Sequence, residues 1–340
     1  MPAHPRRRVA GLAPALVASI ALLLAGCTSA GVTPTLTAPP FSPAPVADPT
    51  TPASPSPAIF ATVTDDEGTI VEIPMEPQRI VSLTPATTEI LFALGAGPRV
   101  IATTDFDDYP PEAVELPDVA SYQAVDVEKI VGLDADLVIA GGNFFNDPNA
   151  IAQLRGLGIP VVVTYAPDTE GVLADIELVG RSTGLTGPAS SLVASMRQGF
   201  DQVGAAVAGL PRPRVFYELD ATSDIYTAAD DSFIAEMIVL AGGEPITTGS
   251  PTDFAISLEK LITADPEVIV LGDAAYGVTA DAVAGRAGWG VMTAVRDGAI
   301  RPANDVIVTR PGPRLVEGLR ELALAIHPGA AVPTPEVAAP

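Results

Sequence analysis

The sequence predicts an α/β protein with two similar lobes joined by one long helix. Three observations lead to this prediction: an internal repeat, apolar runs typical of buried parallel strands, and a long stretch of helical periodicity between the two repeat copies. Residues 127–141 read VEKIVGLDADLVIAG, and residues 258–272 read LEKLITADPEVIVLG. At a constant offset of 131 residues, Glu128 aligns with Glu259. One repeated unit of helix and strand therefore indicates two lobes that are built alike.

Each repeat copy has the same local chemistry. A glutamate opens a short helix, where a carboxylate is stabilised by the positive end of the helix dipole. The helix ends at an Asp-Ala or Asp-Pro step, and an unbroken aliphatic run follows. The runs Leu137–Ala140 and Val268–Leu271 are typical of strands buried on both faces of a parallel sheet. Two ordinary helix-to-strand units would explain this pattern, but the matched glutamates also indicate a shared surface role.

The composition excludes several classes of function. The formal net charge is -23, and it becomes about -26 without the three arginines Arg6–Arg8, which argues against a nucleic-acid partner. Cys27 is the only cysteine, and His327 is the only histidine after the first few residues. Zinc sites made of Cys and His, Cys-His nucleophile pairs and disulfides therefore have no residues to form from. A hydrolase with paired carboxylates stays open, although no spacing indicates one.

The first 27 residues are typical of a bacterial export signal. Arg6–Arg8 supply the positive start, and residues 12–24 supply an apolar core that is short for a membrane span. The segment ends in LLAGC, which resembles the lipobox of bacterial lipoproteins and predicts lipidation of Cys27. Residues 28–58 are rich in Pro, Thr and Ser and predict a disordered tether, and residues 329–340 predict a disordered tail.

The folded part is expected to run from residue 59 to residue 328. We expect an N-terminal lobe at 59–168, a helical segment including the interlobe helix at 169–210, and a C-terminal lobe at 211–328. The predicted elements are a hairpin of 61–64 with 70–73, strands at 79–83, 100–102, 161–164 and 214–219, helices from Thr87 to Gly95 and from 231 to 240, two helices at 169–184 and 188–210, and a last helix that ends at His327.

Aromatic side chains are concentrated on the loops that border the predicted strands. In open α/β sheets, ligands bind at the carboxyl ends of the strands, where these loops lie. Each aromatic taken alone could equally be a core residue, and we interpret Trp289, between two glycines, as structural. The candidate aromatic residues are Phe106, Tyr122, Phe144 and Phe145 in the first lobe and Tyr226 and Phe254 in the second.

Five stretches resemble the substrate-binding lipoproteins of ABC importers for vitamin B12, haem and iron chelates. They are residues 79–89 (RIVSLTPATTE), residues 108–113 (DYPPEA), the two repeat copies, and residues 310–314 (RPGPR), and together they span about 79–327. The resemblance implies two Rossmann-like lobes with a ligand cleft between them, joined by one long rigid interlobe helix. It also implies only small lobe movements. The stretch at 108–113 looks most like the vitamin B12-binding members.

The resemblance also implies roles for individual residues. In the B12-binding relatives, aromatics from both lobes hold the corrin, and the matching positions here are Phe106, Tyr122 and Tyr226. At two family positions this sequence has Gly141 and Asp253, so Phe144 or Phe145 and Phe254 are expected to stand in. Asp305 and Arg310 match polar cleft residues, and an anionic ferric siderophore would require more arginines than Arg310 and Arg314 offer.

In the same family, one glutamate on each lobe docks into arginine pockets of the permease, which implies Glu128 and Glu259 here. A matched carboxylate on each lobe also suits a partner with two-fold symmetry. Stabilisation of a helix N-terminus, worth about 0.3 to 1 kcal/mol each, is the plainer explanation.

The sequence as a whole thus predicts an extracytoplasmic binding protein anchored to the cell membrane by a lipid on Cys27. We expect it to be a monomer without catalytic residues, bound metal or cofactor of its own. Its expected partners are an ABC permease dimer with ATPase subunits and a ligand that is a cobalt corrinoid. A ferric siderophore or haem is the alternative ligand, and a surface-anchored hydrolase is the alternative from another class.

Overall fold

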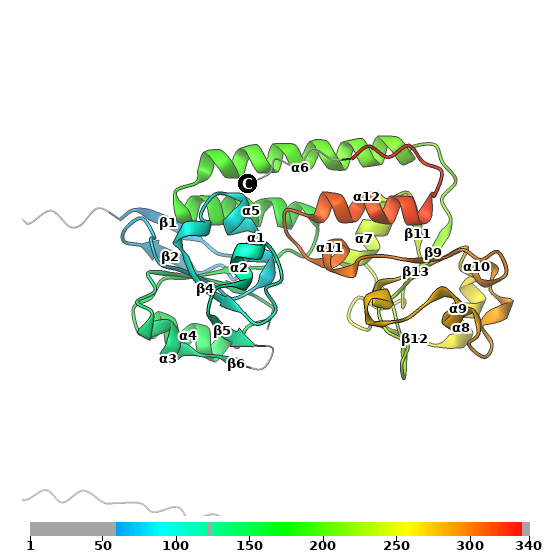
Figure 1. Cartoon of the computed structure of the whole chain (residues 1–340), viewed down its shortest axis with the longest axis horizontal. Coiled ribbons are helices and arrows are strands. Elements are labelled where there is room, and N and C mark those ends of the chain that lie inside the picture. Colours follow the sequence, from blue (N-terminus) through cyan, green and yellow to red (C-terminus); the bar gives the residue numbers. More distant parts are fainter. Residues whose placement is uncertain (1–58, 122–123, 144, 335–340) are drawn as a thin grey trace, which may run out of the picture. The chain divides into compact units, whose positions relative to one another are not determined.

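The computed structural model describes residues 59–121, 124–143 and 145–334. The chain divides into two units, residues 1–54 and 55–340, and every described residue belongs to the second unit. The predicted signal, Cys27, the tether, Tyr122 and Phe144 lie outside the described residues. Within the second unit, the predicted α/β class is confirmed: two mainly parallel sheets, each with its own helices, are connected through long helices (Figure 1).

The N-terminal lobe is built around a six-stranded sheet with the strand order β6-β5-β4-β3-β7-β8. All neighbouring strands are parallel except β5 and β6. The central strands consist entirely of buried residues, as a sheet covered on both faces requires. The strands are β3 (Ile80–Ser82), β4 (Val100–Thr104), β5 (Asp118–Ser121), β6 (Ala124–Val125), β7 (Leu137–Gly141) and β8 (Val161–Thr164).

Helices cover both faces of this sheet, and alternate residues of each strand serve the two faces. In β7, Leu137 and Ile139 belong to one hydrophobic core, and Val138 and Ala140 belong to another. The first face is covered by α1 (Pro85–Ala93) and the second by α3 (Val127–Gly132) and α4 (Pro148–Gly156). The lobe also contains the hairpin β1 (Ala61–Thr64) and β2 (Ile70–Ile73), the 3₁₀ helix η1 (Gly97–Arg99) and α2 (Pro111–Val114).

The C-terminal lobe repeats this plan on a smaller scale. Its sheet has four parallel strands in the order β11-β9-β13-β14, and a separate two-stranded sheet pairs β10 with β12. The elements are β9 (Arg214–Glu218), β10 (Ile225–Tyr226), α7 (Phe233–Leu240), β11 (Glu244–Pro245), β12 (Ala255–Ile256), α8 (Leu258–Ala264), β13 (Val268–Leu271), η2 (Gly272–Tyr276), α9 (Ala280–Ala284), η3 (Trp289–Val291), α10 (Thr293–Arg296), β14 (Ile300–Pro302), α11 (Asp305–Thr309) and α12 (Leu315–Ile326).

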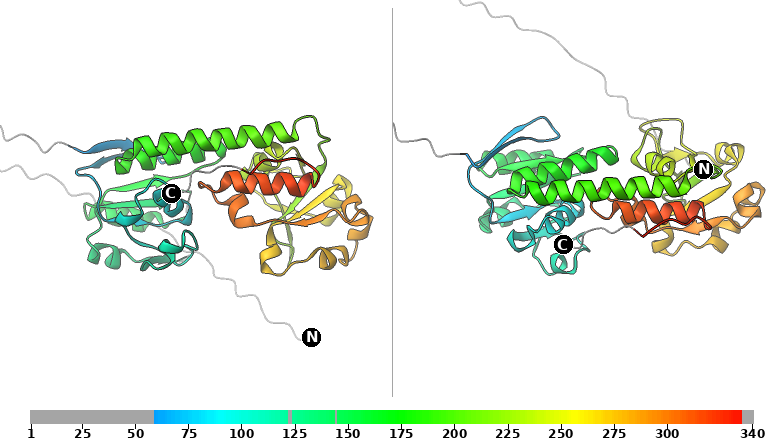
Figure 2. Two further views of the ribbon diagram at one scale, coloured as in Figure 1. Left: turned by 45° about the horizontal axis from the view of Figure 1, so that its top comes forward. Right: turned by 90° about the horizontal axis from the view of Figure 1, so that it is seen from above.

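Two consecutive helices connect the lobes, α5 (Thr169–Thr183) and α6 (Thr186–Val207). The helix α6 contacts α5 along one part of its length and α12 and α7 along another (Figures 1 and 2). The predicted interlobe helix is thereby confirmed, with bounds a few residues from those expected. One hydrophobic core runs without interruption from Ile90 of α1 through Met196 of α6 to Leu319 of α12. The two lobes therefore share a core, which opposes wide hinge motion.

Glycine positions explain how closely these helices approach one another. A Cβ atom at Gly199 of α6 would lie 2.4 Å from Val316 Cγ1 of α12, and one at Gly180 of α5 would lie 2.5 Å from Ala189 Cβ of α6. Neither contact is possible for a larger residue unless the neighbouring side chain or its helix shifts. At Gly204, five residues further along α6, a Cβ atom would meet nothing within 4 Å. Gly199 is thus needed for the close packing of α6 on α12.

The internal repeat is confirmed in three dimensions, because β7 and β13 occupy matching places beside β3 and β9. The helix before each strand is capped by its preceding residue: Asp126 accepts from the Lys129 amide at 2.9 Å, and Ser257 accepts from the Lys260 amide at 3.2 Å. The ammonium of Lys129 donates to the Asp118 carbonyl at 2.6 Å, and that of Lys260 donates to the Thr248 carbonyl. The only two lysines of the chain thus serve equivalent positions in the two lobes.

Two details of the sequence interpretation need correction. The helix α1 begins at Pro85 rather than Thr87, because the hydroxyl of Thr84 caps it by accepting from the Thr87 amide at 3.1 Å. The prediction that disorder begins at residue 329 is wrong for the described part of the tail. Val332 is 7% exposed and belongs to the shared core, and the Pro333 carbonyl accepts from Arg320 Nε at 3.0 Å.

Candidate functional site

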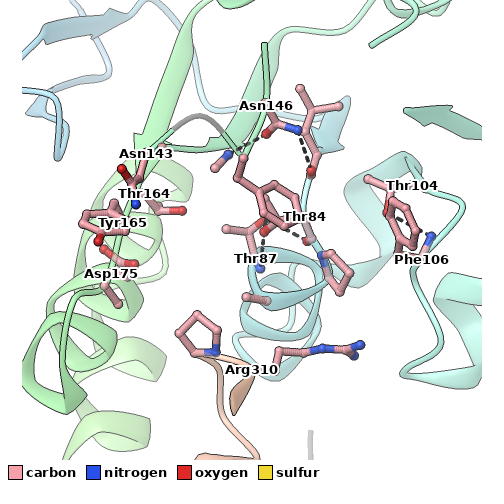
Figure 3. A pocket seen from close by; sticks show the side chains of 18 of the residues that line it. Thr84, Thr87, Thr104, Phe106, Asn143, Asn146, Thr164, Tyr165, Asp175 and Arg310 are labelled. Atoms are coloured by element: carbon pink, nitrogen blue, oxygen red, sulfur yellow. Dashed lines mark hydrogen bonds between the residues drawn. The ribbon is translucent and has the colours of Figure 1, made fainter. Parts of the chain in front are cut away.

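A cavity of about 830 Å³ lies at the carboxyl ends of the N-terminal sheet, in the size range typical of small-molecule sites. Residues just after β3, β4, β7 and β8 line it, and the segment Asp305–Pro311 of the C-terminal lobe closes one side (Figure 3). The location agrees with the expectation from the strand ends. The cavity is therefore bordered by both lobes, although the N-terminal lobe provides most of its walls.

The back of the cavity is fixed by buried hydrogen bonds between neighbouring strand ends. The Asn146 amide, 6% exposed, accepts from the Gly141 amide at 2.7 Å and donates to the Leu83 carbonyl at 3.1 Å (Figure 3). It thereby joins the ends of β7 and β3. Beside it, the hydroxyls of Ser82 and Thr87 lie 2.7 Å apart at the start of α1. These contacts fix the backbone on which the aromatic residues of the site are mounted.

Three exposed aromatic side chains border the cavity. Phe106 is 42% exposed, Phe145 58% and Tyr165 45%. The loop that carries Phe106 is held by Asp107, which accepts from the Thr104 hydroxyl at 2.7 Å and from the Thr104 amide at 2.8 Å. Side chains of this size are normally buried, so their exposure in a concave surface indicates a surface for an apolar or flat ligand.

Gly141 leaves the space that Phe145 and Thr84 occupy at the end of β7. A Cβ atom at position 141 would lie 2.6 Å from Thr84 Cγ2 and 3.0 Å from Phe145 Cδ1. No larger side chain fits there while both neighbours keep their positions. Packing at the strand end therefore excludes an aromatic at position 141, and the role of Phe145 in its place remains a prediction.

The arginines beside the cavity are neutralised by carboxylates. Arg310 Nη1 lies 2.8 Å from Glu89 Oε1 and 2.5 Å from Asp108 Oδ1. Arg314 donates from Nη2 to Glu89 Oε1 at 2.6 Å and from Nε to Glu89 Oε2 at 3.0 Å. The guanidinium of Arg314 also lies over the ring of Tyr109, 4.2 Å from its centre. Two positive and two negative charges thus form a cluster with no net charge.

Asp305 is partly engaged by its own lobe. Its Oδ1 accepts from the Tyr217 hydroxyl at 2.8 Å, and its Oδ2 accepts from the Thr309 hydroxyl at 3.3 Å. Burial raises the pKa of Asp305 above its ordinary value, against the opposing effect of these hydrogen bonds. Asp305 therefore borders the cavity with some of its hydrogen-bonding capacity already used.

The opposite wall contains an acid that the sequence analysis missed. Asp175 lies on α5, is 5% exposed and lines the cavity near Tyr165 (Figure 3). Burial raises its pKa to about 9, and the neighbouring carboxyl of Asp66 adds to the effect. The sequence contained one signal that could have identified Asp175, namely an acid on an otherwise apolar face of a helix. Tyr165 was missed too, although it directly follows a strand and the same strand-end argument would have found it.

The structure brings together four of the predicted ligand-binding residues: Phe106, Phe145, Asp305 and Arg310 all line the cavity. Tyr226 and Phe254 do not border it. Tyr226 ends β10 and pairs with Ala255 of β12, and Phe254 directly precedes β12, where its carbonyl accepts from the Thr227 amide at 2.9 Å. Tyr122 and Phe144 lie outside the described residues, and the ligand contacts of all eight residues remain predictions.

Glu128 and Glu259 occupy equivalent surface positions, each in the first turn of a short exposed helix. Within the described part of the chain, neither carboxylate forms an ion pair. Trp289, by contrast, is 3% exposed and packs edge-on against Phe216, as a structural residue should.

The described residues include no group of three or more His, Cys, Asp or Glu side chains arranged to hold a metal ion. None of the described helices has the length and apolar character needed to span a membrane.

Comparison with known proteins identifies the family. The model for periplasmic binding proteins matches residues 80–305. An uncharacterized ABC transporter substrate-binding lipoprotein of Bacillus subtilis, YvrC, is 34% identical over 272 residues, which cover 78% of this chain and 85% of that protein. The vitamin B12-binding protein BtuF of Vibrio cholerae has a TM-score of 0.65 and 28% identity, covering 74% of this chain and 98% of its own.

A haem-binding protein is equally similar in structure. RhuT of Roseiflexus sp. RS-1 has a TM-score of 0.65 and 27% identity, covering 74% of this chain and 98% of its own. The overall likeness therefore supports a binding function but does not select a ligand. From the family match and these relatives, the chain belongs to the periplasmic binding protein family of ABC transporters, whose members are extracytoplasmic solute-binding proteins that work with permease and ATPase components.

Proposed function

We propose that this protein captures a corrinoid in the cavity described above and delivers it to an ABC permease without performing chemistry on it. One observation carries the choice of ligand: the cavity combines exposed aromatic faces with arginines that are already neutralised by carboxylates. Such a site suits a large, flat ligand with little negative charge.

The aromatic faces supply most of the expected binding energy. Phe106, Phe145 and Tyr165 come from three different strand ends and are each about half exposed. Burying an aromatic side chain removes about 150 to 250 Å² from water with little loss of side-chain freedom. A corrin ring has the size and rigidity to contact several such faces at once. Tyr226 and Phe254 of the C-terminal lobe do not border this cavity, so their predicted contacts would require a ligand that extends beyond it.

The charge of the cluster favours a corrinoid over an anionic chelate. Haem carries two carboxylates, and ferric siderophores are commonly anionic, so both are best bound by arginines that are free to pair with them. Here Glu89, only 3% exposed, holds Arg310 and Arg314. A corrinoid carries neutral carboxamides around its ring and needs hydrogen-bonding groups rather than uncompensated cations.

Haem or a ferric chelate is the alternative ligand, supported by the likeness to RhuT. For it to bind, the two arginines would have to leave Glu89 and Asp108 and turn to the ligand. This would leave a buried carboxylate without a partner, which is unfavourable.

Delivery is proposed to use Glu128 and Glu259. They are exposed, unpaired among the described residues, and related by the internal repeat, as docking on a two-fold symmetric permease dimer requires. Lipidation of Cys27 would keep the protein at the membrane surface, with residues 28–58 as the tether.

The test is equilibrium binding of cyanocobalamin and haemin to the chain without residues 1–27. We expect the visible absorbance of cyanocobalamin to co-elute with the protein in gel filtration. Phe106→Ala should weaken binding about tenfold or more, and Tyr276→Ala is the matched control. Tyr276 is 89% exposed and lies outside the cavity lining, so its removal should leave binding unchanged. Co-elution of haemin but not cyanocobalamin would refute the corrinoid assignment.

A further inference from the structure

Asp175 is a buried acid without a cationic partner. It lies in the middle of α5, surrounded on the same helix face by buried aliphatic residues such as Val172, Ile176 and Val179. Among the described residues, no arginine, lysine or histidine forms an ion pair with it. A carboxyl in such a place lowers stability, so its presence indicates a function.

The group facing Asp175 is another acid, Asp66. Asp66 lies at the turn of the β1–β2 hairpin and is fixed by two backbone contacts: its Oδ2 accepts from the Tyr165 amide at 2.7 Å, and its amide donates to the Val163 carbonyl at 3.1 Å. The neighbouring carboxyl of Asp66 contributes to the raised pKa of Asp175. Because two carboxyls that share a site resist ionising together, the pair holds one proton and one negative charge.

This arrangement leaves acceptor oxygens available to the cavity. A protonated carboxyl keeps an acceptor oxygen, and Asp175 borders the cavity with Thr164, Tyr165 and Asn143 on the same wall (Figure 3). Across the cavity lie Phe106 and Thr104 (Figure 3). A flat ligand held between the aromatic residues would therefore present its edge to Asp175.

We propose that Asp175 is a ligand-binding residue that accepts a hydrogen bond from a neutral N–H donor on the edge of the ligand, such as a primary carboxamide, and disfavours a carboxylate at that position. This inference rests on the proposed function, since it names the group of the ligand that this wall of the cavity recognises. A carboxylate at that position would meet the negative charge of the acid pair, whereas a neutral carboxamide would not be repelled by it.

The test uses two substitutions of similar size. Asp175→Asn keeps an acceptor oxygen and can donate to Asp66, whereas Asp175→Leu removes both abilities. Binding of cyanocobalamin is measured by isothermal titration calorimetry on the chain without residues 1–27, which contains the whole folded unit. We expect Asp175→Leu to weaken binding about tenfold or more and Asp175→Asn to stay within about threefold of the parent.

The outcomes separate this inference from the proposed function. If Asp175→Leu binds cyanocobalamin as tightly as the parent, Asp175 is only structural, and the corrinoid assignment stands. If the parent binds haemin instead, the corrinoid assignment fails. The double variant Asp66→Asn with Asp175→Asn then tests whether the acid pair disfavours a carboxylate. It removes the charge of the pair and should bind haemin about tenfold tighter than Asp175→Asn alone. Equal haemin affinities, or a parent that binds neither compound, would overturn the inference.

Discussion

Glu89, on the first helix of the N-terminal lobe, is held by Arg314 of the C-terminal lobe through two hydrogen bonds of 2.6 and 3.0 Å. Arg310 adds a third contact, at 2.8 Å, to the same carboxylate. Glu89 is almost fully buried, so its charge depends on these two guanidinium groups for compensation. The same contacts therefore fasten the lobes to each other and determine how much positive charge the cavity offers to a ligand.

Replacing Glu89 by Gln should lower the free energy of unfolding by about 1 to 3 kcal/mol. Breaking a fully buried ion pair costs about 3 to 5 kcal/mol. The loss here should be smaller, because the side chains of Arg310 and Arg314 are 15% and 20% exposed. Urea denaturation at neutral pH measures the change. Glu112→Gln makes the same chemical change at an exposed acid of the same lobe and should stay within about 0.5 kcal/mol of the parent.

The same variant tests the charge argument for the ligand. With Glu89 neutral, Arg310 and Arg314 become available to anions, so the affinity for haemin should rise about tenfold while that for cyanocobalamin stays within about threefold. Titration of both compounds into the parent and the variant measures this. An unchanged haemin affinity would show that the cluster does not control ligand choice.

Gly199 and Gly204 provide a matched test of the contact between α6 and α12. Gly199→Ala should destabilise the protein by about 1 to 3 kcal/mol, because the new methyl would lie 2.4 Å from Val316 Cγ1. Gly204→Ala should instead stabilise it by about 0.5 to 1 kcal/mol, since no atom lies within 4 Å and alanine favours the helix. Thermal unfolding followed by circular dichroism distinguishes the two. Equal effects would contradict the role of Gly199 in helix packing.

These glycines also show where sequence reasoning reached its limit. The repeat, the buried strands and the interlobe helix could be predicted because they depend on local periodicity, and β13 (Val268–Leu271) lies where it was expected. The requirement for glycine at 199 depends on Val316, 117 positions away in the chain by their numbers, and local periodicity contains no trace of it. The folded tail was missed for the same reason, because Val332 is buried by residues distant in sequence.

The site was predicted only in part. The residues that could be placed are those whose position follows from a neighbouring strand. Phe106 and Phe145 follow strands, so the strand-end rule placed them at the cavity correctly. Arg310 was predicted as a polar residue of the cleft and does line the cavity, but its contacts with Glu89 and Asp108, more than 200 residues earlier, could not be inferred from spacing. Asp175 was missed because a helix residue becomes a cavity residue only through tertiary packing.

Asp175 also predicts a specific dependence of stability on pH. Its pKa is raised from 3.8 to about 9, so between these values the folded state holds a proton that the unfolded state releases. Its contribution therefore makes the folded state less stable as the pH rises through this window. Asp175→Asn removes the effect, so the stability of the variant relative to the parent should increase from pH 5 to pH 8, by at most about 1.4 kcal/mol per pH unit.

Urea denaturation of both proteins at pH 5, 6.5 and 8 measures this difference, and Asp201→Asn is the control. Asp201 is an exposed acid of α6, and its replacement makes the same reduction in the charge of this acidic chain. We expect the difference between Asp201→Asn and the parent to stay nearly constant over the same range. A constant difference for Asp175→Asn as well would mean that Asp175 is ionised in the folded protein.

The proposed docking surface predicts a loss of transport without a loss of ligand binding. Glu128→Arg combined with Glu259→Arg should abolish uptake of radiolabelled cyanocobalamin by cells in which this chain is the only binding protein, because both lobes would then present positive charge to the arginine pockets expected on the permease. The affinity for cyanocobalamin itself should not change, since neither residue lines the cavity. Glu112→Arg with Asp281→Arg is the control, because it also reverses one exposed first-turn acid in each lobe. If both double variants lose uptake equally, the effect is due to net charge alone. If only the Glu128→Arg and Glu259→Arg variant loses uptake, the two repeated glutamates are the docking residues.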